Sequence, residues 1–209
     1  DVYAKNQALL FLSFKDSVDM SNNLSIHEQW ILGNIDDNIS KSMESYMYRN
    51  GENIELEKQI DAYYNLNTRI QKDYMIIKDH FLDDGFIWIG RGYPYRWVTI
   101  KRMNYLDELM LWYNFKDSIS NNMSNVKIVD YYKNILYESD DIIKIQGLYE
   151  EEFSDSGGPF VSYIKLDRTL KEALIITGFA NNPGKNKNRL LKELEIQIKN
   201  IIGKDKNGK

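Results

Sequence analysis

Cysteine is absent from this chain of 209 residues, and histidine occurs only twice, as His27 and His80. Without cysteine the chain has no disulfide bonds, no thiolate zinc sites, no iron–sulfur clusters and no cysteine nucleophile. We expect no metal site and no cofactor. The absence does not indicate a compartment, because a cysteine-free domain folds equally well in the cytosol and in the periplasm.

Proline is scarce, with three residues, which excludes long polyproline linkers. No apolar run reaches the roughly 18 residues of a membrane-spanning helix. The first residues, DVYAKNQALL, lack the basic and then apolar order of a signal peptide. A net charge of −4 gives no overall attraction to nucleic acid, so we expect no nucleic-acid partner.

Apolar residues are plentiful, at 43% of the chain, and in four segments they recur with the period of an α-helix. These segments are residues 25–47, 53–64, 106–119 and 186–202. In the first, Ser25 and Glu28 have the spacing of a capping box, and a stripe of apolar residues runs from Ile31 to Met47. In the third, the residues expected to point inward are Leu106, Leu109, Met110 and Tyr113.

Seven other segments have the features of β-strands, namely residues 8–14, 73–79, 85–91, 96–102, 141–152, 159–167 and 172–179. The first is a continuous apolar run, which is typical of a strand covered on both faces. The last two are expected to form a hairpin that turns at residues 167–171. The pattern of residues 126–137 supports no assignment.

The order of these segments predicts an α+β fold, with an antiparallel sheet and amphipathic helices packed on one of its faces. A duplicated ferredoxin-like plan is compatible with this order. We expect a single domain over residues 1–203, or alternatively two fused halves at about 1–120 and 121–203. Residues 204–209 form a polar tail.

The stretch FSDSGGPF, residues 153–160, resembles the nucleophile loop of a trypsin-like serine protease around Ser156. A serine nucleophile needs a histidine within hydrogen-bond reach, and the candidates are His27 and His80. A trypsin-like enzyme also has two β-barrels, whereas this chain predicts long helices. We therefore interpret the stretch as a turn, with Gly157 and Gly158 at positive φ before a strand. A hydrolase using Ser156 stays as the alternative.

Aromatic residues gather between two of the predicted strands, at Trp88, Tyr93, Tyr95 and Trp97. Exposed rings at such a place suit binding of a glycan or a partner protein. The second interpretation is that Phe86 and Trp88 pack under the helices, while Tyr93 and Tyr95 flank a turn. If the chain binds a partner, we expect the contact residues to be these four rings together with Gly157, Gly158, Pro159 and Phe160.

Basic residues surround the start of the last predicted helix, at Lys185, Lys187 and Arg189. The positive end of a helix dipole strengthens the attraction of such a cluster for an anion. The alternative is an ordinary solvated surface. This cluster is the candidate anion site.

From residue 145 onward the chain has the pattern GGPFV, then GF and a proline, then LxxLE. The residues of this pattern and those near it are Gly147, Leu148, Gly157, Gly158, Pro159, Phe160, Val161, Gly178, Phe179, Pro183, Arg189, Leu191, Leu194 and Glu195. In these residues the chain resembles the C-terminal region of an uncharacterised lipoprotein family of Bacteroidetes, a domain of unknown function. Segments near residues 1–7 and 86–95 also have counterparts in that family.

The resemblance implies a location in the cell envelope, on the periplasmic side or at the outer membrane. It also implies that a lipid-bearing cysteine lies upstream of this chain, and that only this anchor contacts the membrane. We expect a non-enzymatic binding or scaffolding module with an envelope protein as its partner. The alternatives are the hydrolase using Ser156 and a carrier of an anionic or glycan ligand.

Overall fold

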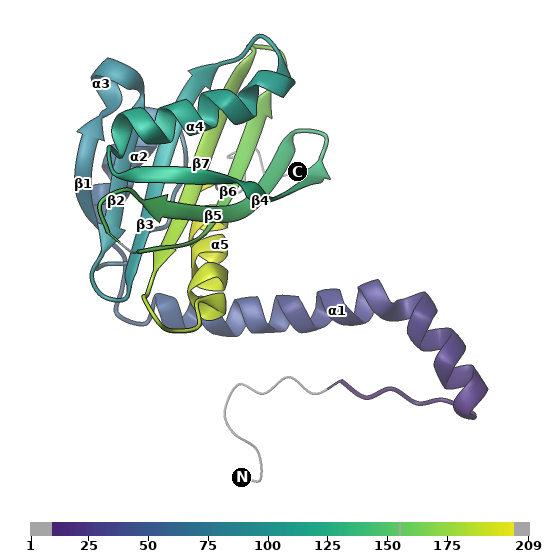
Figure 1. The fold of residues 1–209 in the computed structure, drawn as a ribbon. Helices are drawn as coiled ribbons and strands as arrows, with labels where there is room; N and C mark the ends of the chain where they lie inside the picture. The colour runs from purple at the N-terminus through teal and green to yellow at the C-terminus, as the bar shows by residue number, and fades with distance from the viewer. Residues whose placement is uncertain (1–9, 155, 203–209) are drawn as a thin grey trace. The chain divides into compact units, whose positions relative to one another are not determined.

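The structure, a computed structural model, describes residues 10–154 and 156–202 (Figure 1). The predicted tail at 204–209 lies outside the described residues. The chain divides into two compact units, residues 1–49 and residues 50–209. Within the described part, no helix is both long enough and apolar enough to span a membrane.

The second unit contains a seven-stranded sheet in which all neighbouring strands are antiparallel (Figure 1). The strands are β1 (Met75–His80), β2 (Phe86–Arg91), β3 (Tyr95–Asn104), β4 (Val126–Ser139), β5 (Ile142–Glu151), β6 (Gly157–Asp167) and β7 (Glu172–Asn181). Their order across the sheet is β1-β2-β3-β7-β6-β5-β4. The predicted α+β class is confirmed.

The helices of this unit are α2 (Ile54–Tyr64), α3 (Phe81–Asp84), α4 (Leu111–Asn122) and α5 (Asn188–Ile202). A short 3-10 turn, η1 (Glu108–Met110), precedes α4. Six of the predicted strands correspond to β1, β2, β3, β5, β6 and β7, and the turn at 167–171 joins β6 to β7, where Asp167 pairs with Glu172. The unassigned segment forms β4.

The sheet consists of two hairpin-connected runs, β1-β2-β3 and β4-β5-β6-β7, joined where β3 pairs with β7. In a ferredoxin-like unit, by contrast, a strand is inserted between the two strands of a βαβ unit. The strand order therefore differs from the duplicated ferredoxin-like plan. Helix α4 connects the two runs.

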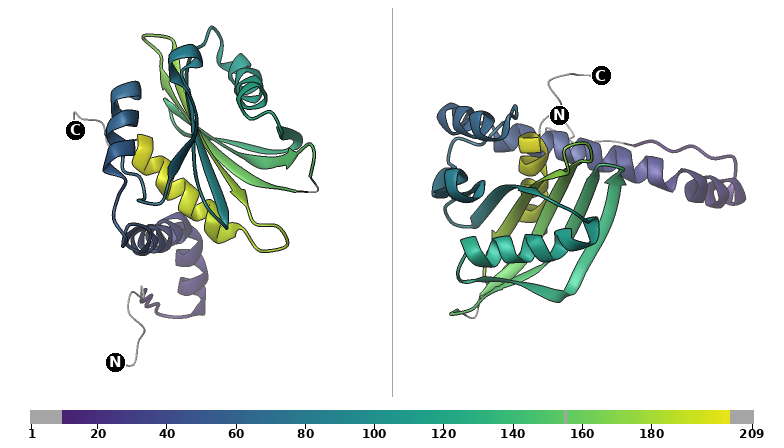
Figure 2. Two further views of the ribbon diagram at one scale, coloured as in Figure 1. Left: turned by 90° about the vertical axis from the view of Figure 1, so that its left-hand side faces the viewer. Right: turned by 90° about the horizontal axis from the view of Figure 1, so that it is seen from above.

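Helices cover both faces of the sheet, and not the single face that was predicted (Figure 2). Helices α2 and α5 pack on one face, and α4 packs on the other. The central strands explain the difference, because successive residues of β7 point to opposite faces and are buried on both. A continuous apolar strand such as ALIITGFA requires cover on both sides.

Each face has its own hydrophobic core. The core under α2 and α5 includes Leu56, Ile60, Tyr64, Ile87, Ile89, Val98, Ile100, Val161, Tyr163, Ile176, Leu190, Leu194, Ile198 and Ile201. The core under α4 includes Phe86, Leu111, Trp112, Phe115, Ile119, Ile128, Ile143, Ile145, Tyr149, Phe160, Ile175 and Phe179. The same strands supply both cores.

The predicted inward face of the third helix is wrong. Leu106 and Tyr113 are exposed, whereas the buried face of α4 contains Leu111, Trp112, Phe115 and Ile119. The helix begins at residue 111 and not near residue 106, because the preceding residues form a bend and the 3-10 turn. Leu106 therefore lies outside the helix, and the face that meets the sheet is formed by residues 111–122.

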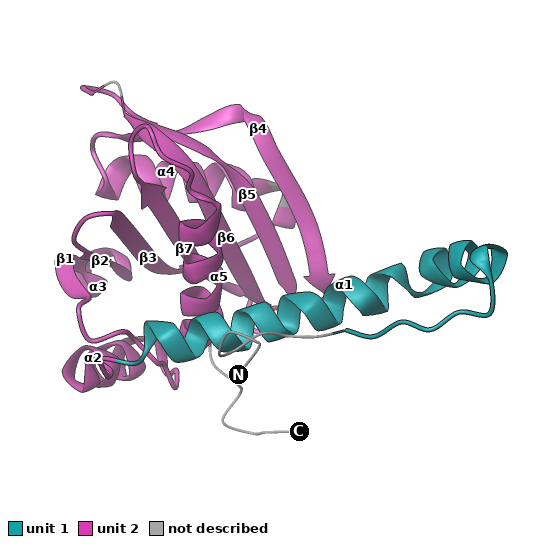
Figure 3. Cartoon of the chain, turned by 90° about the horizontal axis from the view of Figure 1, so that it is seen from below, with its two compact units in different colours: residues 1–49 teal, residues 50–209 magenta. Residues whose placement is uncertain are grey.

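The first unit contains one long helix, α1 (Ser17–Met47), shown in teal in Figure 3. It begins earlier than predicted, because Asp16 rather than Ser25 caps it and accepts hydrogen bonds from the amides of Val18 and Asp19. The predicted stripe faces solvent in part, since Ile35 and Ile39 are exposed.

The predicted strand at residues 8–14 is wrong for residues 10–14, which have no regular structure; residues 8 and 9 lie outside the described residues. No described strand pairs with this apolar run. Instead, Leu12 and Phe14 line a pocket of about 380 Å³ with Trp30, Ile31 and neighbouring residues of α1.

Helix α2 contains a buried carboxyl group, that of Glu57. Glu57 accepts a hydrogen bond from the amide of Ile70 at 2.6 Å and is almost completely buried. Burial raises the pKa of Glu57, and the nearby carboxylates of Glu52 and Asp61 act in the same direction. The folded protein therefore binds a proton on Glu57 more tightly than the unfolded chain does.

This difference predicts a pH-dependent effect of the substitution Glu57→Gln, which keeps an acceptor for Ile70 and removes the charge. Because the folded pKa is raised, the ionised carboxylate lowers stability at pH 7, and this penalty fades as the pH falls towards about 4.3, the ordinary pKa of glutamate. We expect Glu57→Gln to be more stable than the wild type at pH 7, with a smaller gain at pH 5. Urea unfolding at both pH values measures this, and a gain that does not shrink contradicts it.

Candidate functional site

The two groups of predicted contact residues lie at the same end of the sheet. Tyr95, at the start of β3, pairs with Asn181 at the end of β7. Phe160, near the start of β6, pairs with Phe179 of β7. Residues that are some 60 positions apart in the chain therefore meet there.

Aromatic rings form a continuous series from this edge into the core. The centroids of Tyr93 and Tyr95 are 5.9 Å apart, those of Tyr95 and Trp97 are 6.3 Å apart, and those of Trp97 and Tyr149 are 6.2 Å apart. Tyr149 meets Phe179 edge to face at 5.2 Å. These spacings fall within the range of favourable aromatic pairs. We call Tyr93, Tyr95, Trp97, Tyr149 and Trp88 the aromatic corner.

The outer and inner rings of the aromatic corner differ in exposure. Tyr93 is 61% exposed and Tyr95 is 45% exposed, whereas Trp88 and Trp97 are half-buried against the core under α4. Phe86 and Trp88 thus pack against the core, as the second interpretation expects, whereas Tyr93 and Tyr95 lie at the turn and face solvent. Binding by these two tyrosines stays a prediction.

Trp88 meets Trp97 edge to face at 5.6 Å. Its indole nitrogen is buried and has no hydrogen-bond partner among the described residues. A buried N–H without an acceptor costs about 1–3 kcal/mol.

Tyr149 is a member of the corner that the sequence did not single out. Burial raises the pKa of its phenol, and the carboxylate of Glu151 raises it further, so the hydroxyl is neutral at physiological pH. In the sequence, Tyr149 lies in the stretch GLYEEE, two residues after Gly147. The alternation of this strand indicates only that the side chain of Tyr149 faces inward. The contact with Trp97 depends on the strand order, which the local pattern does not contain.

The GGPF stretch begins β6 and is not a turn at positive φ. The positive-φ glycines among the described residues are Gly51, Gly85 and Gly184. Gly157 and Gly158 are needed for another reason, because a Cβ atom on either would overlap a backbone carbonyl oxygen of a neighbouring strand.

Pro159 fits this position because pairing with β7 starts only at Phe160, the next residue. Its missing N–H therefore removes no bond from the β6–β7 ladder. Proline is found near the beginning of strands, and Pro159 is the third residue of β6.

Ser156 lies just before β6, where its hydroxyl is 2.9 Å from that of Ser154. His80 pairs with Phe86, and the registers across the sheet place this row level with Ile164 of β6. Eight residues separate Ser156 from that row, a distance of about 26 Å along a strand. His80 is therefore out of hydrogen-bond reach of Ser156, while His27 belongs to the other unit.

The predicted anion cluster lies before and within the first turn of α5. Arg189 donates a hydrogen bond to Glu193 at 3.2 Å. Lys185 is exposed and Lys187 is half-buried. Glu193 also forms a buried ion pair with Arg96 of β3, so this carboxylate fixes α5 to the sheet.

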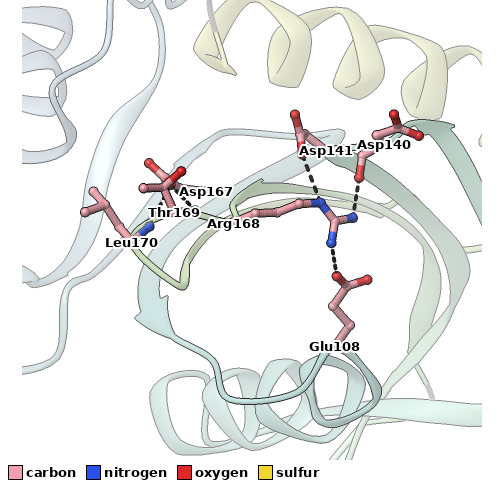
Figure 4. Close-up of polar contacts among 7 residues, drawn as sticks. All are labelled: Glu108, Asp140, Asp141, Asp167, Arg168, Thr169 and Leu170. Atoms are coloured by element: carbon pink, nitrogen blue, oxygen red, sulfur yellow. Dashed lines mark hydrogen bonds and ion pairs between the residues drawn. The ribbon is translucent and has the colours of Figure 1, made fainter.

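A second polar location lies at the opposite end of the sheet, around Arg168 in the β6–β7 turn (Figure 4). Its guanidinium group donates to Asp141 at 3.2 Å, to the carbonyl oxygen of Asp140 at 2.6 Å and to Glu108. It thereby links three connections of the chain: the β6–β7 turn, the β4–β5 turn and η1. No local sequence pattern predicts this cluster, because its members are far apart in the chain.

Arg168 also lines a pocket of about 640 Å³ together with Arg102, Lys165, Asp167 and Glu172. Arg102 donates to the carbonyl oxygen of Tyr64. Acidic and basic side chains are balanced around the pocket, so its charge favours no class of ligand.

The close approach at Gly158 predicts a strong effect of Gly158→Ala. The added methyl group would overlap the carbonyl oxygen of Ala180, so we expect a loss of about 3 kcal/mol in the free energy of unfolding. Gly92→Ala is the matched control, since no atom lies within 4 Å of its Cβ position, and it should change stability by less than about 0.5 kcal/mol. Equal effects in urea unfolding would refute the packing explanation.

A search of curated proteins finds no match to the chain. A family model described as "Domain of unknown function (DUF4837)" matches residues 53–200. The match covers more than half of the chain, lies within the second unit and includes the aromatic corner. The predicted membership in a family of unknown function is confirmed: the chain belongs to the DUF4837 family.

Proposed function

We propose that the chain is a non-enzymatic binding module of the bacterial cell envelope, and that the aromatic corner contacts a partner protein. The observation that supports this best is the exposure of Tyr93 and Tyr95, whose rings continue the series formed by the half-buried Trp97 and the buried Tyr149. Tyrosine is enriched at protein interfaces and loses little conformational entropy on binding.

The base of the corner favours recognition because it is held on strands. Trp97 and Tyr95 belong to β3, whose ten residues all pair with β7. Side chains on paired strands are positioned more accurately than those on loops. A rigid base allows the two tyrosines to bind without first being ordered.

The geometry of the tyrosine pair favours a protein over a glycan. Their ring planes are at 85° to each other, so one flat sugar ring can stack on only one of them. A protein surface with several side chains can contact both rings from different directions.

The hydrolase alternative is less favoured because His80 does not reach Ser156. The resemblance to Bacteroidetes lipoproteins supports a place on the periplasmic side or at the outer membrane. We propose that a lipid anchor upstream of this chain provides the attachment in the full-length precursor. An envelope protein would then be the natural partner.

The proposal predicts that Tyr93→Ser/Tyr95→Ser abolishes partner recovery without unfolding the protein. The matched control is Tyr113→Ser/Tyr131→Ser, which removes two exposed tyrosines elsewhere in the same unit. After gentle crosslinking of full-length protein in its native envelope, quantitative mass spectrometry compares the recovered proteins. Loss of two contact residues of about 2 kcal/mol each should reduce recovery of the partner at least about tenfold.

Thermal unfolding of both variants checks that the fold is intact. Recovery that is unchanged in Tyr93→Ser/Tyr95→Ser, or reduced equally in the control, would contradict a role for the aromatic corner. A wild-type protein that yields no stoichiometric partner would contradict the binding-module proposal itself.

A further inference from the structure

Strand β4 is one of the two edges of the sheet and has 14 residues. Its first residues, Val126 and Ile128, are buried under α4, whereas every residue from Tyr131 to Ser139 is exposed. Tyr131 is 92% exposed, Tyr137 is 72% exposed and Ile135 is 40% exposed. An edge strand has a row of backbone N–H and C=O groups that can pair with another strand.

The position of this edge is fixed by a bulge. The register with β5 shifts between Val129 and Lys133, and residues 130–132 oppose no residue of β5. Within the bulge, Asp130 accepts hydrogen bonds from Lys116 at 2.9 Å and from the indole of Trp112 at 3.2 Å. The bond from Lys116 lowers the pKa of Asp130, so this anchor to α4 is ionised at neutral pH.

Between this bulge and a second one near Ser139, five residues pair regularly with β5. They are Lys133, Asn134, Ile135, Leu136 and Tyr137. This stretch, KNILY, contains no proline and no bulge, and of the charged side chains that protect an edge it has only that of Lys133. Lys133 is the single charged residue, and its ammonium group lies 4.5 Å from the ring centroid of Trp112.

The other edge of the sheet is less suited to pairing. β1 has six residues, and a register shift between Ile76 and Lys78 divides it. Its regular part after the shift consists of Lys78, Asp79 and His80, which are polar. Short, bulged and charged strands are poor templates for strand addition.

We propose that the KNILY edge pairs with the same edge of a second copy of this chain, antiparallel and centred on Ile135. In a two-fold antiparallel pair, each residue faces one whose side chain lies on the same side of the sheet. The two regular stretches coincide fully only when Ile135 faces Ile135 of the second copy. Lys133 then faces Tyr137, and Asn134 faces Leu136.

The distribution of charge supports this register. In the centred arrangement no two like charges face each other, and Lys133 meets a tyrosine ring on the α4 side. A pair centred on Asn134 would place Asp130 opposite Glu138, and one centred on Lys133 would place two lysines face to face. Like charges directly opposite each other destabilise a strand pair. Charge therefore disfavours the registers centred on Asn134 and Lys133, and the full overlap of the two regular stretches favours Ile135 over Leu136 as the centre.

The absence of cysteine allows a clean test, because any single introduced cysteine is the only thiol in the chain. In the full chain, Ile135→Cys would place two thiols opposite each other, with Cα atoms about 4.5–5.5 Å apart, within the range of a disulfide. Asn134→Cys and Leu136→Cys are one residue away on the other side of the sheet. Ile77→Cys, on the exposed part of β1, is the control for random collision.

Under mild oxidation we expect Ile135→Cys to form a covalent dimer and the other three variants to form none. Crosslinking centred on residue 134 or 136 would overturn the proposed register. Equal crosslinking of all four variants, including Ile77→Cys, would overturn the proposed pairing.

Sedimentation equilibrium of the unmodified chain gives an independent measurement. We expect a concentration-dependent dimer that shifts to monomer in Ile135→Lys, since two lysines would then face each other at the symmetry axis. Ile77→Lys should retain the dimer. A wild-type chain that is monomeric over the whole concentration series, or a dimer that persists in Ile135→Lys, would refute the proposal. The test does not depend on the aromatic corner.

Discussion

The pairing of β3 with β7 is the constraint on which the rest of the second unit depends. All ten residues of β3, from Tyr95 to Asn104, face all ten residues of β7, from Asn181 back to Glu172. This ladder joins two runs of strands that are separate in the sequence. A slip of one residue would exchange the side chains of the two cores, which makes the register strongly specified.

The same ladder places polar groups as well as apolar ones. Arg96 of β3 reaches Glu193 of α5 in a buried ion pair, and burial lowers the pKa of that arginine. Within the sheet, the hydroxyls of Ser162 and Thr177 are 2.8 Å apart and fully buried. Breaking one partner of a buried pair costs far more than the pair contributes. A different placement of α5 or of the strands would leave these buried polar groups without partners, and such arrangements are therefore destabilised.

Local patterns in the sequence predict most of the elements of this fold. The apolar alternation in GFIWIGR and RWVTIKR corresponds to β2 and β3, and the stripe from Leu190 to Ile201 corresponds to α5. The failures involve longer-range effects. β4 was not assigned because its exposed half carries no inward and outward alternation. The predicted buried face of α4 was wrong because its apolar stripe was counted from Leu106, which precedes the helix.

For the candidate site, too, the sequence predicts the local clusters but not the contacts between them. The four rings near Pro94 and the GGPF stretch are visible in the sequence as separate clusters, but their meeting requires the strand order. Tyr149, which connects them, gives no local signal. Arg168 and its three partners are likewise brought together only by the turns at one end of the sheet.

The two glycines before Pro159 have a further consequence for how relatives of this protein are recognised. Gly157 and Gly158 lie where neighbouring backbones leave no room for a Cβ atom, so this chain needs them for packing, whatever it binds. The glycines of the SDSGGP stretch therefore have a packing explanation that does not depend on any chemistry at Ser156. A match to this short motif alone indicates neither the fold nor the activity, and both must be judged from the rest of a chain.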